Sequence, residues 1–420
     1  MLSKSVLGLI VKDQLSEFEA LKDTVPRARL AAISSFKGSS AFVVKGVRRC
    51  GKSTLLKQFM KSNFVEDFYY FNFDDERISG FTARDFQPLM EVFLTVFGKR
   101  KNILFDEIQN IVGWELFVNR LLRQGYKLFI TGSNANLLSK ELGTHLTGRH
   151  VDVELYPFSF TEFLKAVGAK FSANSFYSTE EKAMLSNLFS NYFLNGGMPE
   201  STVFSNDSVL VQVPSDIIQK DVVIRYKIRK PSDLKAVAKF LLSNAGNLIS
   251  YRSIADNFLI SANTVQKYIN YLEETYLIFT VHRFDRKIKR FDKNLKKVYC
   301  VDNGIVTKNT VSFNEKKGAL LENLVAIHLK RIGSEVYYYA GRNSECDFVI
   351  PQRREAIQVC YDLDQNNFKR ETKGLVEAMH ETKATVGLIL TFNQDTWKHL
   401  PKKVTVKPVW QWLLETEPVS

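Results

Sequence analysis

The chain has 420 residues, of which 45% are hydrophobic, and its 58 lysines and arginines against 45 aspartates and glutamates give a formal net charge of +13. This length exceeds one ordinary domain and the hydrophobic content is enough for packed cores, so we expect roughly two to four domains. The basic balance favours an anionic partner, with nucleic acid the first candidate, although many soluble proteins are basic without one.

The cysteines and the hydropathy of the chain indicate the cellular compartment in which we expect it. Cys50, Cys300, Cys346 and Cys360 are scattered and form no C-x-x-C pair, so neither a disulfide framework nor a zinc site is indicated. No apolar stretch is long enough to span a membrane. We therefore expect a cytoplasmic protein with no membrane partner.

The first 160 residues predict a helical segment followed by an α/β domain. Residues 1–30 carry a helical pattern that ends near Pro26. Residues 31–160 repeat strand, loop and helix, which is typical of a parallel sheet covered by helices. The expected strands are Phe42–Lys45, Phe68–Phe73, Ile103–Phe105, Leu128–Thr131 and Val151–Leu155.

A glycine-rich stretch follows the first expected strand. The sequence GVRRCGKS, from Gly46 to Ser53, fits the P-loop pattern G-x-x-x-x-G-K-[ST] and leads into a helical sequence. Its glycines let backbone N–H groups point at phosphate oxygens, and the start of the helix adds its positive end. We expect Lys52 to bind the β- and γ-phosphates of ATP and Ser53 to hold Mg²⁺. The expected nucleotide-contacting residues are Gly46, Val47, Arg48, Arg49, Cys50, Gly51, Lys52, Ser53 and Thr54.

Two acidic residues end the third expected strand, in the sequence NILFDEI. An apolar strand ending in Asp106 and Glu107 is typical of a Walker B motif, in which Asp106 binds the Mg²⁺ shell and Glu107 orients or deprotonates the attacking water. Two solvated acids at a strand end are the alternative, and the preceding P-loop argues against it. The extra strand between the two motifs favours an additional-strand ATPase over a small GTPase.

The fourth and fifth expected strands complete the ATPase prediction. The fourth ends in Ser133 and Asn134, where a polar side chain can contact the γ-phosphate or the attacking water. Arg149 precedes the fifth strand, where it either acts as an arginine finger on a neighbouring subunit or caps the strand at the surface. The predicted catalytic residues are Lys52, Glu107, Asn134 and Arg149, and the finger implies self-association.

Several segments together resemble the prokaryotic AAA+ ATPases that carry a C-terminal domain of unknown function. They are GVRRCGKSTLLKQF, FNFDDERI, ILFDEIQNIVGWE, FITGSNANLLS, LTGRHVDVELYPFSFTEF and GGMPE at Gly196–Glu200. The resemblance extends through Gly318–Asn323 and Glu345–Ile350, and so covers nearly the whole chain. It agrees with an AAA+ core at residues 31–160 and a helical lid at 161–225, which offers no clear sensor-2 arginine.

Residues 226–290 predict a winged helix, because three helical patterns precede an expected wing strand. The outer face of the third helix carries Asn263, Thr264, Lys267 and Asn270, which can contact bases and phosphates from the major groove. A winged helix that contacts only proteins is the alternative.

A basic run, His282–Lys297, follows the third helix of the expected winged helix. In it, Arg286, Lys287, Lys289 and Arg290 would neutralise phosphates and make DNA binding strongly salt-dependent. A solvated linker is the other interpretation of this run.

Residues 291–420 mix strands with an amphipathic helix, and the resemblance implies a PD-(D/E)xK nuclease-like domain there. In working members, carboxylates bind Mg²⁺ and a lysine helps to activate water. The corresponding residues here are Glu322, Glu345, Asp347 and Gln358, while Cys360 stands where the lysine is expected. Since one carboxylate and the lysine are replaced, we expect a nucleic-acid-binding or structural remnant rather than an active nuclease.

These patterns together predict an ATP-hydrolysing AAA+ protein that uses Mg²⁺ and engages DNA through its winged-helix and nuclease-like domains. Two other interpretations stay open, namely a nucleotide-dependent switch that binds protein partners without DNA, and an ATP-gated nuclease. DNA-stimulated hydrolysis separates the first from the second, and metal-dependent cutting would reveal the third.

Overall fold

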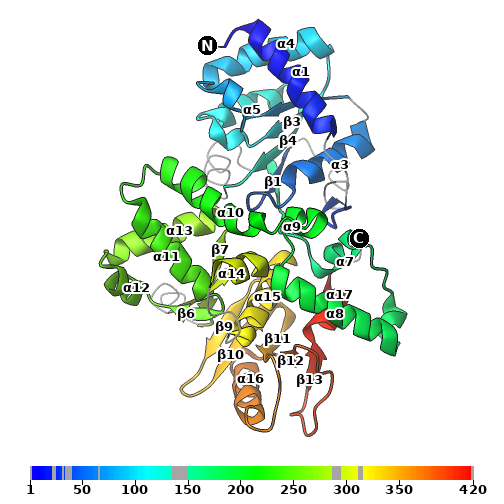
Figure 1. Cartoon of the computed structure of the whole chain (residues 1–420), viewed down its shortest axis with the longest axis vertical. Helices are drawn as coiled ribbons and strands as arrows, with labels where there is room; N and C mark the ends of the chain where they lie inside the picture. The colour runs from blue at the N-terminus through cyan, green and yellow to red at the C-terminus, as the bar shows by residue number, and fades with distance from the viewer. Residues whose placement is uncertain are drawn as a thin grey trace. The chain divides into compact units, whose positions relative to one another are not determined.

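The computed structural model describes residues 2–20, 25–30, 33, 40–64, 67–134, 149–176, 178–285, 295–310 and 316–417. The chain folds into two compact units (Figure 1). Unit 1 comprises Met1–Tyr156 with Glu274–Tyr276, and unit 2 comprises Pro157–Glu273 with Leu277–Val419. Among the described residues, no helix is both long and apolar enough to cross a membrane.

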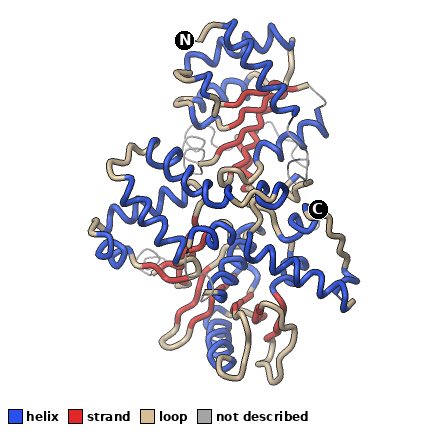
Figure 2. The backbone as a smooth tube through the Cα atoms, in the orientation of Figure 1, coloured by secondary structure: helices blue, strands red, loops and turns tan. Residues whose placement is uncertain are grey.

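Unit 1 is built on a parallel sheet of five strands in the order β2-β3-β4-β1-β5. Figure 2 draws strands in red and helices in blue. The strands are β1 (Ala41–Lys45), β2 (Phe68–Asn72), β3 (Asn102–Asp106), β4 (Lys127–Gly132) and β5 (His150–Glu154). The predicted α/β fold and all five predicted strands are confirmed, with ends that differ by one residue. Nearly every residue of the first four strands is buried, as expected for a parallel sheet covered on both faces.

Helices cover the two faces of this sheet. They are α1 (Lys4–Ala20), α3 (Lys52–Phe64), α4 (Phe86–Phe97) and α5 (Trp114–Arg123), with short 3₁₀ turns at Glu76–Ile78, Ala83–Asp85 and Ile108–Asn110. One strand face, including Ile103 and Phe105, forms a core with α1, α4 and α5. The alternate residue Phe129 faces the other way and packs against Phe59 of α3. This arrangement holds the carboxyl ends of β1, β3 and β4 at one edge, where ligands bind in open α/β sheets.

Unit 2 contains most of the helices of the chain. They are α7 (Phe160–Ala166), α8 (Thr179–Asn195), α9 (Pro199–Phe204), α10 (Ser208–Asp216), the π-helix η5 (Ile217–Ile224), α11 (Pro231–Ser243), α12 (Tyr251–Phe258), α13 (Ala262–Glu274), α14 (Asn303–Asn309), α15 (Lys317–Arg331), α16 (Phe368–Thr382) and α17 (Val409–Thr416). Helix α15 is buried on all sides from Leu320 to Leu329, so it forms the centre of the unit.

An eight-stranded sheet runs through unit 2 in the order β13-β12-β11-β10-β9-β7-β8-β6. Its strands are β6 (Asn247–Ile249), β7 (Ile278–Arg283), β8 (Lys296–Cys300), β9 (Tyr337–Ala340), β10 (Glu345–Ile350), β11 (Glu355–Val359), β12 (Val386–Thr391) and β13 (Val404–Pro408). Strands β6, β8 and β7 pair antiparallel, and β7 joins β9 in parallel. The predicted boundary between the winged helix and the nuclease-like domain, at residue 290, lies outside the described residues, and the strands before and after it, β7 and β8, pair in the same sheet.

The GGMPE element has a packing role in unit 2. Gly196 ends α8 with a φ of 70°, and a Cβ on it would lie 2.1 Å from Oδ1 of Asp302. The backbone N–H of Gly197 donates to Oδ2 of Asp302 (2.7 Å), while Oδ1 accepts from Ile305 N (3.2 Å) at the start of α14. Pro199 then begins α9, where its missing N–H costs nothing. These glycines thus let two helix ends meet at one buried carboxylate.

Candidate functional site

The P-loop of unit 1 lies between β1 and α3 and is held tightly against the end of β5. A Cβ on Gly46 would lie 2.1 Å from the carbonyl oxygen of Leu155, so only glycine fits there. Arg49 and Gly51 have positive φ values of 62° and 94°, and these let the backbone turn sharply within the loop. Lys52 then begins α3, so the loop leads directly into a helix N-terminus.

Arg27 hydrogen-bonds to this loop and was not predicted as a site residue. Its side chain is buried and donates from Nη1 to the Cys50 carbonyl oxygen (2.8 Å) and from Nη2 to the Tyr156 carbonyl oxygen (2.5 Å). Burial raises the pKa of the Cys50 thiol, although Lys52 and Arg27 oppose this rise. Cys50 is therefore a neutral packing residue of the loop at neutral pH.

Lys52 is buried at the centre of the site. Its Nζ donates to the carbonyl oxygens of Gly46 (3.1 Å) and Val47 (3.2 Å) and lies 3.3 Å from Oε1 of Glu107. Burial alone would lower the pKa of Lys52, but the carboxylate of Glu107 outweighs it, and the pKa lies above its ordinary value. The ammonium is thus charged, and its partners are oxygen atoms of the kind a phosphate also offers.

Glu107 is held in an uncommon backbone conformation directly after β3. Its φ and ψ of 51° and 40° are left-handed, which costs a non-glycine residue about 1 kcal/mol or more. Its Oε2 accepts from Gln109 Nε2 (2.5 Å) and from Ser133 N (3.2 Å). Burial would raise the pKa of Glu107, but Lys52 dominates and the pKa lies below its ordinary value. The site therefore fixes an ionised carboxylate between β3 and β4.

Asp106 lies beside Glu107 in a group of hydroxyl-bearing residues. It accepts hydrogen bonds from Ser53, from Thr131 and from the Tyr70 hydroxyl, the last at 3.3 Å. Burial and the neighbouring Glu107 raise the pKa of Asp106. Because Thr131 also accepts from Glu107 N (3.0 Å), it links both acidic residues. Thr131 and Tyr70 were not predicted as site residues, because neither belongs to the P-loop or Walker B pattern, although Thr131 lies in the quoted segment FITGSNANLLS.

The other predicted ATPase residues lie at two places. Ser133 and Asn134 are buried directly after β4, and among the described residues Oγ of Ser133 has no hydrogen-bond partner. Arg149 lies at the start of β5, is exposed, and donates to Oδ1 of Asn119 on α5 (3.4 Å). The roles of Asn134 and Arg149 stay predictions.

The predicted DNA-contacting residues of α13 are at the surface of unit 2. Asn263, Lys267 and Asn270 are exposed, and Thr264 is half-buried. Thr264 and Lys267 line a pocket that α13 shares with residues 227–233. The other four predicted residues, Arg286, Lys287, Lys289 and Arg290, lie outside the described residues.

The predicted nuclease-like residues meet around a buried lysine of unit 2 that was not predicted, and one of them, Glu345, has a side chain that is 45% exposed. Nζ of Lys297, on β8, lies 2.9 Å from Glu322 Oε1, 2.6 Å from Glu345 Oε1 and 2.9 Å from Asp347 Oδ1. Gln358 accepts from Asp347 N at 3.3 Å. Glu345 and Asp347 face the same ammonium because they are two residues apart on one strand.

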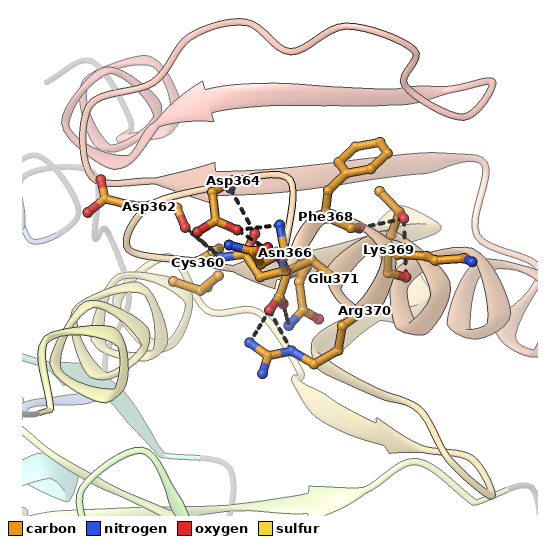
Figure 3. Close-up of polar contacts among 12 residues, drawn as sticks. Cys360, Asp362, Asp364, Asn366, Phe368, Lys369, Arg370 and Glu371 are labelled. Atoms are coloured by element: carbon orange, nitrogen blue, oxygen red, sulfur yellow. Dashed lines mark hydrogen bonds and ion pairs between the residues drawn. The ribbon is translucent and has the colours of Figure 1, made fainter.

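Cys360, at the position where the resemblance places a lysine, contacts a turn instead (Figure 3). Its Sγ donates to the Asp362 carbonyl oxygen (3.0 Å), and burial raises its pKa to about 12. Glu371, which Figure 3 shows beside Arg370 on α16, accepts from Gln358 Nε2 at 2.7 Å. The expectation that this site lacks an ammonium is therefore wrong, because Lys297 supplies one from another strand.

Two family models match the chain. A model described as an AAA domain matches residues 38–164, which include the P-loop and both acidic residues after β3. A model described as a domain of unknown function matches residues 186–315.

Three curated relatives span most of the chain. MJ1544 of Methanocaldococcus jannaschii, described as an uncharacterized protein, is 35% identical over 393 residues, covering 89% of this chain and 88% of its own. A Haemophilus influenzae protein is 32% identical, covering 78% of this chain and 84% of its own. MJ1637 of M. jannaschii is 23% identical, covering 82% and 79%.

Solved structures give only weak likenesses. A STAND protein with a tetratricopeptide repeat sensor from Pyrococcus horikoshii has a TM-score of 0.27 and 16% identity, and the match covers 74% of this chain and 47% of that one. PCH-2 of C. elegans has a TM-score of 0.26 and 10% identity, covering 50% and 61%. Neither likeness carries an argument about this chain.

Proposed function

This chain belongs to the same prokaryotic family as MJ1544, with an AAA domain in its N-terminal part, and we propose that it binds ATP with Mg²⁺ and hydrolyses it. One observation carries the proposal. The P-loop lysine, Lys52, lies 3.3 Å from Glu107, while Asp106 accepts from Ser53. The phosphate-binding and water-activating groups thus meet at one edge of the sheet, as hydrolysis requires.

The residues around Asp106 fit Mg²⁺. The Ser53 hydroxyl and the Asp106 carboxylate are hydrogen-bonded to each other, so their oxygens are close enough to serve one ion, and Mg²⁺ prefers such oxygen ligands. Mg²⁺ neutralises charge on the phosphates when it is bound.

ATP binding would exchange the partners of Lys52. Without nucleotide, its ammonium is shared between the carbonyl oxygens of the loop and Glu107. Phosphate oxygens of ATP carry more negative charge than carbonyl oxygens and would attract Lys52 away from them. Glu107, still held by Gln109 and Ser133 N, would then be free to orient a water.

Arg149 supports a role for a second copy of the chain, because its side chain is exposed at the edge strand β5. If it contacts a neighbour's γ-phosphate, Arg149→Ala should bind ATP normally and hydrolyse it about 10³-fold slower or more. Mixing Arg149→Ala with Lys52→Ala should restore part of the activity, because each chain supplies what the other lacks. Activity per molecule that does not depend on protein concentration, with no rescue on mixing, would contradict this role.

We further propose that unit 2 binds DNA, and the pocket beside α13 supports this. Lys227, Arg229, Lys230 and Lys267 line it together with one acid, Asp233. The order of elements from α11 to β8, with β8 paired between β6 and β7, is compatible with α13 acting as the second helix of a helix-turn-helix and supports the proposal. Such a cationic surface neutralises phosphates without reading sequence.

Replacing Lys227, Lys230 and Lys267 by glutamine should weaken binding to duplexes of any sequence by about tenfold or more. The slope of log affinity against log salt should fall by about 0.9 for each lost phosphate contact. Lys165→Gln with Lys170→Gln, two exposed lysines elsewhere in unit 2, is the matched control. Fluorescence anisotropy at several salt concentrations measures both quantities, and an unchanged slope in the triple variant would move the DNA surface elsewhere.

The experiment that joins the two proposals is an ATPase assay with and without duplex, single-stranded and branched DNA. Stimulation by one of them supports an ATPase that works on DNA. A constant rate, with no DNA binding, would favour the nucleotide-dependent switch that binds only proteins.

A further inference from the structure

A lysine occupies the centre of the carboxylate cluster in unit 2. Lys297 comes from β8, Glu322 from α15, and Glu345 and Asp347 from β10, so three separate elements converge on one ammonium. The three oxygen atoms lie 2.6–2.9 Å from Nζ, and the Lys297 side chain is 3% exposed. Burying an ammonium to this extent without a partner would cost free energy of folding. The carboxylates beside Lys297 are therefore needed to stabilise its charge.

Two further hydrogen bonds support the cluster. The Tyr299 hydroxyl donates to Glu322 Oε1 (2.6 Å), and Asp347 Oδ2 accepts from the backbone N–H of Val359 (2.9 Å). Burial would lower the pKa of Lys297, but Asp347 and Glu322 raise it well above its ordinary value. Burial and Asp347 raise the pKa of Glu322. The Lys297 side chain is therefore a charged ammonium.

Hard divalent cations also bind carboxylate oxygens, at about 2.0–2.6 Å. As they stand, no three acidic, histidine or cysteine side chains in the described part of the chain are arranged to hold a metal ion, and in this cluster the three oxygens surround Nζ of Lys297 instead. We propose that the Lys297 ammonium takes the place of a divalent cation in this cluster, so that the fold keeps its acidic residues without a metal ion. A metal ion bound to the same three oxygens would overlap Nζ, so the two occupants exclude each other.

The backbone of β8 keeps Lys297 in this place. Lys297 pairs with Val281 of β7 on one side and Leu248 of β6 on the other. In addition, Asn323, next to Glu322, accepts from Cys300 N (2.7 Å) and donates to the Cys300 carbonyl oxygen (3.1 Å). The strand and the helix are thereby fixed to each other, which keeps the backbone of Lys297 beside Glu322.

The test is to remove the ammonium and ask whether a metal site appears. In the full-length, nucleotide-free protein, Lys297→Met should gain one Mn²⁺ site that the wild type lacks, with a dissociation constant at least about tenfold tighter than any wild-type site. The unfolding midpoint of Lys297→Met should be higher in Mn²⁺ than in EDTA, whereas the wild-type midpoint should be the same in both. Lys296→Met, on the same strand, should behave as the wild type.

A second comparison does not depend on the folding of Lys297→Met. Wild type and Asp347→Asn should bind Mn²⁺ with equal stoichiometry, and neither should cut single-stranded, duplex or branched DNA. A folded Lys297→Met that gains no site would overturn the proposal. So would a Mn²⁺ site or a DNA-cutting activity of the wild type that Asp347→Asn removes, because the lysine would then assist a bound metal ion instead of replacing it.

Discussion

Glu107→Gln should bind ATP as tightly as the wild type and hydrolyse it about 10²–10⁴ times more slowly. The amide keeps the shape of the side chain but cannot accept a proton from water, and general-base catalysis contributes a factor of this size. Phosphate binding is spared because Lys52 and the backbone of the loop are unchanged. Steady-state phosphate release gives the rate, and equilibrium binding of a fluorescent ATP analogue gives the affinity.

A matched control for this variant is Glu91→Gln on α4. Glu91 is an exposed carboxylate of the same unit and pairs with Lys4 (2.6 Å), so losing its charge tests general effects of the substitution. We expect wild-type hydrolysis from it. Wild-type hydrolysis by Glu107→Gln itself would show that another residue activates the water.

Lys52→Ala should lose tight ATP binding altogether, because the phosphates lose the only buried ammonium described at the P-loop. The same change should also destabilise the nucleotide-free protein, since the mostly buried Glu107 would lose the ammonium that stabilises its charge. Removing one partner of a buried ion pair costs up to about 3–5 kcal/mol. Because 17% of the Glu107 side chain stays exposed, we expect a smaller loss than that.

The double variant Lys52→Ala with Glu107→Gln separates the two effects of Lys52. It should recover part of the lost stability, because the unpaired carboxylate is gone, but none of the ATP binding. Urea unfolding of the four proteins of this cycle gives the coupling free energy. ATP affinity close to that of the wild type in Lys52→Ala would contradict the assignment of the loop.

Sequence reasoning succeeded where function depends on neighbours in the chain. The P-loop and the Asp106–Glu107 pair are local patterns, and the first four strands of unit 1 show as mostly apolar runs, while the fifth, HVDVE, alternates valine with polar residues. The supporting residues could not be found in this way. Arg27 reaches the loop from 23 residues away, and Thr131 reaches Asp106 across 25 residues.

The C-terminal part shows the same limit more strongly. The resemblance included Gly318–Asn323 and Glu345–Ile350. It placed the lysine that accompanies their carboxylates at position 360, directly after the strand that follows Asp347. Lys297 is 50 residues from Asp347 in sequence, and only the pairing of β8 with β7, and of β7 with β9, brings it to the cluster. The sequence of one predicted domain does not show that its strands pair with those of the next.

The most direct test of the central proposal is phosphate release by the purified wild-type chain from ATP, with Mg²⁺ and with EDTA, in the presence of DNA. Lys52, Glu107 and Asp106 at one sheet edge predict turnover that requires Mg²⁺ and disappears in EDTA. ATP that binds tightly in Mg²⁺ and is then recovered intact, with no phosphate released over many hours, would contradict an ATPase and leave a nucleotide-binding switch.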